Sequence, residues 1–251
     1  MKFERIVNAA ALAGKIMLEA GGETYRVEDT INRILTSYGV DLAESFVLPT
    51  GIIVSGQVEG RGISTLVRRV SSIQVDLEKI SLVNDLSRQI VEDKLTVEQF
   101  MQELDIIMKR PHYPFWMVVF FAGFITFSFS IIFRGGLAEA AVAFAAGILV
   151  YLVRQLARSI HLNMFMQNAV GGMAAVFIAG AAFSLKFIES PSTVIIAAIM
   201  LLVPGITITN AIRDTFQGDY LSGVTRAMEA FVTAGGIAFG TGAAVFLMGV
   251  I

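Results

Sequence analysis

The chain has 251 residues, a mean hydropathy of +0.70, a formal net charge of −2 and no cysteine. This composition excludes a disulfide framework, a thiolate metal site and a cysteine nucleophile. The near-neutral charge, without a basic stripe, gives no support to a nucleic-acid partner.

The charged residues are divided unequally at about Pro114. The first 114 residues hold 13 of the 19 Lys and Arg and 16 of the 21 Asp and Glu. A charge in hydrocarbon costs about 2.5–3.5 kcal/mol. We therefore expect a water-soluble domain at residues 1–110 and a membrane domain at residues 111–251.

The N-terminal domain is predicted to contain two helices, three strands and two further helices, an α+β fold. An apolar stripe from Ile6 to Met17 predicts a helix that ends at Gly21-Gly22, and a second helix should end before Gly39. The other expected elements are strands at Phe46–Leu48, Gly51–Val58 and Ile63–Val70, a helix at Leu77–Ile90 and a helix after a capping box at Thr96–Gln99.

The second domain is predicted to be all-α, because its apolar runs approach the roughly 20 residues that span a bilayer. Lys109 and Arg110 precede the first run, and Arg154 and Arg158 follow the second. This bias predicts a cytoplasmic N-terminus and an external C-terminus. The five expected transmembrane helices are Phe115–Phe133, Leu137–Val153, Leu162–Leu185, Thr193–Ile212 and Val224–Leu247.

Polar residues within these spans are candidates for substrate binding. Asn163 and Gln167 share a helix face at the start of the third span. Pro204-Gly205 should break or kink the fourth, and broken helices place backbone groups at transporter substrate sites. Thr207 and Asn210 follow the break. A kink without a functional role is the alternative for this segment.

The fifth span begins with two charged residues, Arg226 and Glu229, separated by three positions. They can pair with each other, which lowers the cost of burial, or reach the interface along their stems. An ionisable residue in a membrane indicates a functional site.

The N-terminal domain has one dense polar cluster, formed by Glu23, Arg26, Glu28 and Asp29. Acidic residues in a first helical turn are also explained by the helix dipole alone. No phosphate-binding loop, Ser-His-Asp arrangement or HExxH motif is present. We therefore predict a protein that is not an enzyme and that has no cofactor and no metal.

Four strings, in one order along almost the whole chain, resemble the threonine/serine exporter (ThrE-like) family. They are GGETYRVEDT at 21–30, ESFVLPTGI at 44–52, DLEKI with VNDLSR between 76 and 88, and PG, NAIRD with GDYLSG between 204 and 223. The family includes split members, and the chain looks like their larger, YjjP-type half.

The resemblance implies a secondary exporter of the bacterial inner membrane that is driven by the proton-motive force. Family members export threonine and serine, and the split pair is associated with succinate. Because the chain stops at Ile251, after its last span, it looks like the larger half. A smaller YjjB-like membrane subunit, a homo-oligomer, or both are then implied as partners.

The resemblance and the polar pattern coincide between the fourth and fifth spans. Arg213 can bind a substrate carboxylate bidentately, and Asn210 can hydrogen-bond the substrate. The candidates for proton coupling are Asp214, Asp219 and Glu229. The alternative is that Arg213-Asp214 only caps a helix on the cytoplasmic side.

Two other classes of protein compete with an exporter. The first is a non-transporting membrane subunit whose soluble domain regulates or docks a separate carrier. The second, an intramembrane hydrolase, is disfavoured because the sequence has no paired aspartates within a span and no Ser/His pair.

Overall fold

A computed structural model of the chain describes residues 2–60, 62–93, 95–111 and 113–249. The chain forms two compact units. Unit 1 comprises residues 1–111 together with 206–227, and unit 2 comprises residues 112–205 together with 228–251. Unit 1 therefore takes in a segment that hydropathy alone assigns to the membrane domain.

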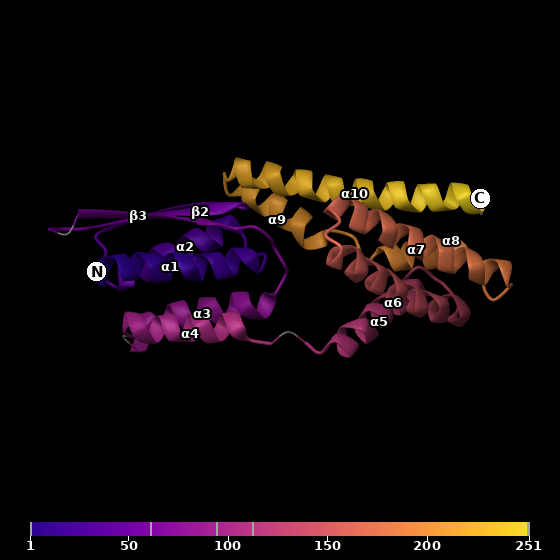
Figure 1. Cartoon of the computed structure of the whole chain (residues 1–251), viewed down its shortest axis with the longest axis horizontal. Helices are drawn as coiled ribbons and strands as arrows, with labels where there is room; N and C mark the ends of the chain where they lie inside the picture. The colour runs from indigo at the N-terminus through magenta and orange to yellow at the C-terminus, as the bar shows by residue number, and fades with distance from the viewer. Residues whose placement is uncertain (1, 61, 94, 112, 250–251) are drawn as a thin grey trace. The chain divides into compact units, whose positions relative to one another are not determined.

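Unit 1 contains an α+β fold in three layers (Figure 1). An antiparallel sheet in the order β1-β2-β3 lies against α1 and α2, and α3 and α4 pack against the opposite side of these two helices. The elements are α1 (Lys2–Glu19), α2 (Thr24–Ser37), β1 (Leu42–Leu48), β2 (Gly51–Val58), β3 (Gly62–Arg69), α3 (Leu77–Asp93) and α4 (Val97–Lys109).

The α+β prediction for this region is confirmed in its element order. The capping box is present, since the Thr96 side chain accepts from the Gln99 N–H and the Gln99 side chain accepts from the Thr96 N–H. Alternation along β2 places Ile52 and Val54 in the core. The core lies between the sheet and the helices, where Met17, Ile31 and Phe100 are fully buried.

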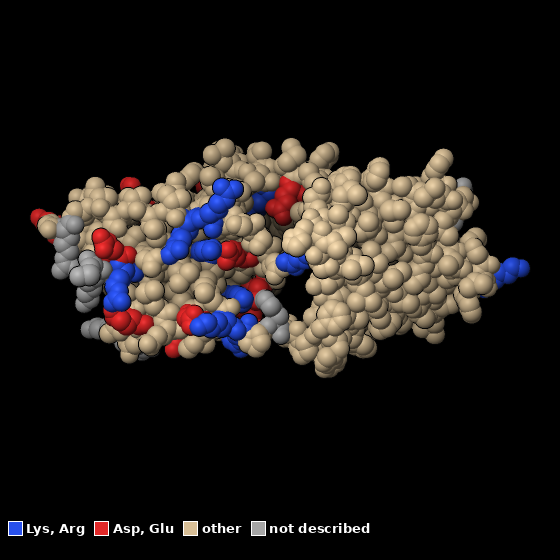
Figure 2. Space-filling view, in the orientation of Figure 1, with Lys and Arg blue, Asp and Glu red and all other residues tan. Residues whose placement is uncertain are grey.

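Unit 2 is helical, and its surface carries almost no charge in the view of Figure 2, whereas Lys, Arg, Asp and Glu side chains gather on unit 1. Its helices are α5 (Phe115–Ile132), α6 (Leu137–Ser159), α7 (Met164–Ser184) and α8 (Pro191–Ile199). After α9 (Gly205–Phe216), α10 (Tyr220–Met248) begins in unit 1 and continues into unit 2.

The prediction of five transmembrane helices is wrong in its fourth member. In the described part of the chain, four helices are long and apolar enough to cross a membrane: α5, α6, α7 and α10. The predicted span Thr193–Ile212 is divided into α8, of 9 residues, and α9, of 12 residues. At 1.5 Å per residue, neither approaches the roughly 30 Å of a hydrocarbon core.

The break itself was predicted from Pro204, and it lies between Ile199 and Gly205. Proline has no N–H, and its ring clashes with the preceding helical turn. The second predicted span, in contrast, is longer than expected and ends at Ser159 rather than Val153.

Small residues bring the helices of unit 2 close together, as in other membrane bundles. Between α5 and α6, the Thr126 hydroxyl donates to the Ala143 carbonyl across 2.7 Å. A Cβ built on Gly240 of α10 would lie only 1.9 Å from the carbonyl oxygen of Ala169 in α7. Gly240 therefore permits a contact between α7 and α10 that any larger side chain would block.

The contacts between α7 and α10 show that these two helices run parallel. Phe165 lies against Gly236, and Ala169 lies against Gly240 further along both helices. The chain therefore returns between them, by way of α8. The start of α8 is held by Glu139 of α6, whose carboxylate accepts from the Glu189 N–H at 3.0 Å.

Candidate functional site at the start of α2

A turn of two glycines connects α1 to α2 in unit 1. The Gly22 N–H donates to the Met17 carbonyl at 2.9 Å and the Gly21 N–H donates to the Leu18 carbonyl at 3.0 Å. Gly21 has a φ of +87°. This is the Schellman pattern that ends a helix, and it requires a residue that tolerates positive φ. The turn leaves the carbonyls of both glycines free to accept other donors.

Those carbonyls accept from side chains that come from the far end of the chain. Asn210 of α9 donates its amide to the Gly21 carbonyl at 2.9 Å. Arg226 of α10 donates Nη2 to the Gly22 carbonyl at 2.8 Å. The backbone of the turn is thus bound by side chains 189 and 204 positions further along the chain.

A buried ion pair lies beside this turn. The Nε of Arg226 donates to Oδ2 of Asp214 at 2.9 Å, and the two side chains are 3% and 0% exposed. The other carboxylate oxygen, Oδ1, accepts from the N–H of Thr24, the first residue of α2, at 3.2 Å. A negative charge at a helix N-terminus is stabilised by the unpaired N–H groups there. Asp214 therefore neutralises Arg226 and caps α2.

Asp219, between α9 and α10, and β1 complete the cluster. The Thr24 hydroxyl donates to Asp219 at 3.3 Å. The carboxylate of Glu28 on α2 accepts from the Val47 N–H at 2.8 Å. Burial raises the pKa of Glu28, and the negative charges of Asp219 and Asp214 raise it further, against the lowering effect of the Val47 N–H. These contacts join residues from three of the sequence strings that carry the family resemblance, at 21–30, 44–52 and 204–223.

A polar pocket of about 520 Å³ opens next to the cluster, within unit 1. It is lined by Glu23, Tyr25, Arg26, Arg213, Phe216 and Gln217. The Glu23 carboxylate is 7% exposed and accepts from Arg213 at 2.5 Å and from Arg26 at 3.3 Å. The two guanidinium groups are 56% and 43% exposed in their side chains, so both can also contact a solute.

The charge state of Glu23 follows from these contacts. Burial raises its pKa, but its own backbone N–H and the Arg213 and Arg26 side chains outweigh burial, and the net pKa is lowered. Glu23 is therefore ionised at neutral pH. A pocket with two guanidinium groups and one carboxylate can bind a carboxylate and an ammonium group at the same time.

The structure brings some of the predicted site residues together. Asn210, Asp214 and Asp219 surround the glycine turn, and Arg213 lines the adjacent pocket with Glu23 and Arg26. Asp29 lies apart from them, paired with Arg33 on the exposed side of α2.

The remaining candidates lie elsewhere. Asn163 caps α7 by accepting from the Met166 N–H at 2.9 Å, and Gln167 donates to the Leu162 carbonyl at 2.7 Å. These two residues belong to unit 2, as do Pro204, Gly205 and Glu229, whereas Thr207 belongs to unit 1.

Arg226 was not predicted as a member of this site. Sequence spacing allowed a pair with Glu229 or a side chain that reaches the interface, and in the structure the Arg226 guanidinium pairs with Asp214. One signal pointed to a buried partner: Arg226 is a lone basic residue at the start of a long apolar helix. The sequence could not tell which carboxylate that partner is.

A charged unit joined to four long apolar helices defines a multispanning membrane protein. A family model described as "Putative threonine/serine exporter" (ThrE) matches residues 8–248. The chain therefore belongs to the threonine/serine exporter family, as its sequence strings predict.

Three relatives illustrate the range of the family. "Probable succinate transporter subunit YjjP" of Escherichia coli (strain K12) is 25% identical over 217 residues, which cover 85% of this chain and 83% of that protein. "Probable threonine/serine exporter" of Mycobacterium tuberculosis is 26% identical over 92% of this chain but 44% of its own length. "Threonine/serine exporter" of Corynebacterium glutamicum is 24% identical over 94% of this chain and 50% of its own length. No solved structure matches the chain.

Proposed function

We propose that this chain is a secondary exporter of small polar carboxylates, or the larger subunit of one, in the bacterial inner membrane. Threonine, serine and a dicarboxylate such as succinate are the proposed substrates, with the proton-motive force as the driving force. The names of the relatives support this class of substrate. The observation that carries the proposal is the pocket in which Arg26 and Arg213 flank the Glu23 carboxylate.

The chemistry of this pocket suits a small carboxylate. A guanidinium fork matches a carboxylate bidentately, and both arginines retain exposed donors. Glu23 is ionised and can accept from the ammonium group of an amino acid. We infer that unit 1 is cytoplasmic and that this pocket first captures the substrate there.

The other proposed binding residues would act later in the pathway. Asn210 would contact substrate only in a state where it has released the Gly21 carbonyl. Thr207, Pro204-Gly205, Gln167 and Asn163 would contact it further along. For proton coupling we propose Asp219 and Glu229, and Asp214 in a state where Arg226 has moved away.

A second membrane subunit is part of the proposal. The Escherichia coli relative is named a subunit, and the mycobacterial relative is more than twice as long as the region it shares with this chain. Both facts support assembly with a smaller, YjjB-like membrane partner. A homo-oligomer of this chain is compatible with the same arrangement.

Efflux from proteoliposomes loaded with labelled threonine or succinate, with and without a pH gradient, tests the proposal. Arg213→Ala should abolish efflux while the protein still inserts. Arg33→Ala, a half-exposed arginine of α2 outside the pocket, is the matched control. Wild-type efflux by Arg213→Ala would remove Arg213 from the mechanism.

The same experiment separates the exporter from its rival. Efflux that requires co-reconstitution with a second membrane subunit, and that Arg213→Ala abolishes, supports a half-transporter. If the partner transports equally well without this chain, the chain is instead a subunit that docks or regulates a separate carrier.

A further inference from the structure

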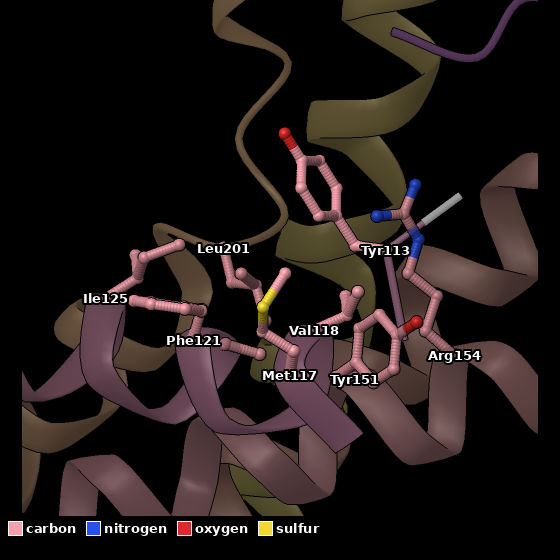
Figure 3. A pocket seen from close by; sticks show the side chains of 9 residues that line it. Tyr113, Met117, Val118, Phe121, Ile125, Tyr151, Arg154 and Leu201 are labelled. Atoms are coloured by element: carbon pink, nitrogen blue, oxygen red, sulfur yellow. The ribbon is translucent and has the colours of Figure 1, made fainter. Parts of the chain in front are cut away.

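Unit 2 contains a pocket of about 470 Å³ between the start of α5 and the end of α6 (Figure 3). Most of its lining is apolar, from Met117, Val118, Phe121 and Ile125 of α5 and from Leu201. Its polar groups are few: the guanidinium of Arg154 and the side chains of two tyrosines, Tyr113 and Tyr151.

Figure 3 shows that these groups are segregated. In this view Ile125 and Phe121 lie toward one end of the pocket, and the Arg154 guanidinium lies at the other end, near Tyr113. The pocket is thus amphipathic along its length. A small dicarboxylate would leave one of its carboxylates against hydrocarbon, which is costly.

Arg154 lacks an anionic partner in the part of the chain that the structure describes. Its guanidinium makes no hydrogen bond or ion pair with another described residue, and Arg158, four residues further along α6, has a charge of the same sign. An arginine beside apolar side chains in a membrane normally pairs with an anion or reaches the interface. Its guanidinium can therefore bind an anion that enters the pocket.

The position of Arg154 along its helix matches the depth of a lipid headgroup. It lies five residues before Ser159, the end of α6, which is about 8 Å along the axis. Tyr151 packs against Phe115, the first residue of α5, with ring centroids 6.2 Å apart. Trp116 follows on an exposed site, as expected of an aromatic residue at a membrane interface.

We propose that this pocket binds an anionic phospholipid. Its phosphate accepts from Arg154, with the hydroxyl of Tyr151 as a further donor. One acyl chain lies along Met117, Phe121 and Ile125. The segregation of one cation from a continuous apolar wall selects an amphiphile with a single anionic end.

Native mass spectrometry of the detergent-purified full chain tests this site. Phosphatidylglycerol and phosphatidylcholine with identical acyl chains are titrated separately. Phosphatidylglycerol should bind at least five-fold more tightly to the wild type, and Arg154→Gln should remove that preference. Arg134→Gln, an exposed arginine in the connection between α5 and α6, is the matched control and should retain it.

Two further arms keep the test decisive. Val118→Phe, which narrows the middle of the pocket and keeps the guanidinium, should weaken phosphatidylglycerol binding several-fold. Glycerol phosphate, the headgroup without acyl chains, should not compete. Equal affinity of the wild type for both lipids, an unchanged preference in Arg154→Gln, or effective competition by glycerol phosphate would each overturn the proposal.

Discussion

The buried pair between Asp214 and Arg226 offers the sharpest test of how unit 1 is held together. Arg226→Met removes the guanidinium and keeps most of the side-chain volume. Asp214 would then remain as a buried charge with the Thr24 N–H as its described donor, and the Gly22 carbonyl would lose its Arg226 donor. The substitution therefore measures the effect of losing the positive charge and its hydrogen bonds, with little change in packing.

The expected cost follows from burial. Breaking a buried ion pair by removing one partner costs about 3–5 kcal/mol, because the remaining charge is left uncompensated. The pair between Arg213 and Glu23 is shorter, at 2.5 Å, but the Arg213 side chain is 56% exposed. An ion pair open to solvent contributes about 0–1 kcal/mol. Judged by distance alone, the pair of Arg213 with Glu23 would be expected to contribute more to stability than the pair of Arg226 with Asp214.

The assay is protease cleavage of unit 1 in the full-length protein, measured in detergent as a function of urea. Arg226→Met should lower the urea midpoint strongly, and Arg213→Met should lower it slightly or not at all. Asp214→Leu combined with Arg226→Met should regain much of the loss, because no lone charge is then buried. Equal, small shifts for the two single variants would refute the reasoning.

Two further predictions concern one residue in each unit. The pKa of Glu28 is higher in the folded protein than in the unfolded chain. Ionisation of Glu28 therefore destabilises the fold as the pH rises from the pKa of the unfolded chain through the pKa of the folded protein. Glu28→Gln, which still accepts from the backbone, should raise the thermal midpoint at pH 7 by a small amount and leave it unchanged near pH 3. A larger gain in thermal midpoint at pH 3 than at pH 7 would contradict this pH dependence. In unit 2, Gly240→Val should prevent the protein from eluting as a single monodisperse peak in size-exclusion chromatography, since the new Cβ would lie 1.9 Å from a backbone oxygen. Gly242→Val is the control, because no atom lies within 4 Å of the position of its Cβ; equal behaviour of the two would remove close helix contact as the cause.

Local chemistry predicted the local features well. The glycine turn after α1, the capping box at Thr96 and the break before Gly205 each depend on a few adjacent residues. Such features are encoded by dihedral preferences and by side chains that reach one helical turn. The sequence therefore indicated where most elements begin and end.

The wrong fourth span and the unpredicted partner of Arg226 both arise from long-range effects. An average over hydropathy merges α8 and α9 into one span, because Ile206, Ile208 and Ile212 are apolar even though α9 packs within unit 1. The pairing rule for one helix joins Arg226 to Glu229, whereas the real partner lies on a different helix, 12 residues earlier. Sequence spacing contains no information about which helices meet.

The discontinuity of unit 1 has a consequence for how the protein is made. Synthesis proceeds from the N-terminus at about 5–20 residues per second, so α5, α6 and α7 leave the ribosome before Asn210, Asp214 and Arg226 exist. Until then the glycine turn has none of these three partners. While the membrane helices insert, the first 111 residues lack the second segment of unit 1, residues 206–227. A chain cut before residue 206 would lack the second segment of unit 1, and the glycine turn would never acquire these partners.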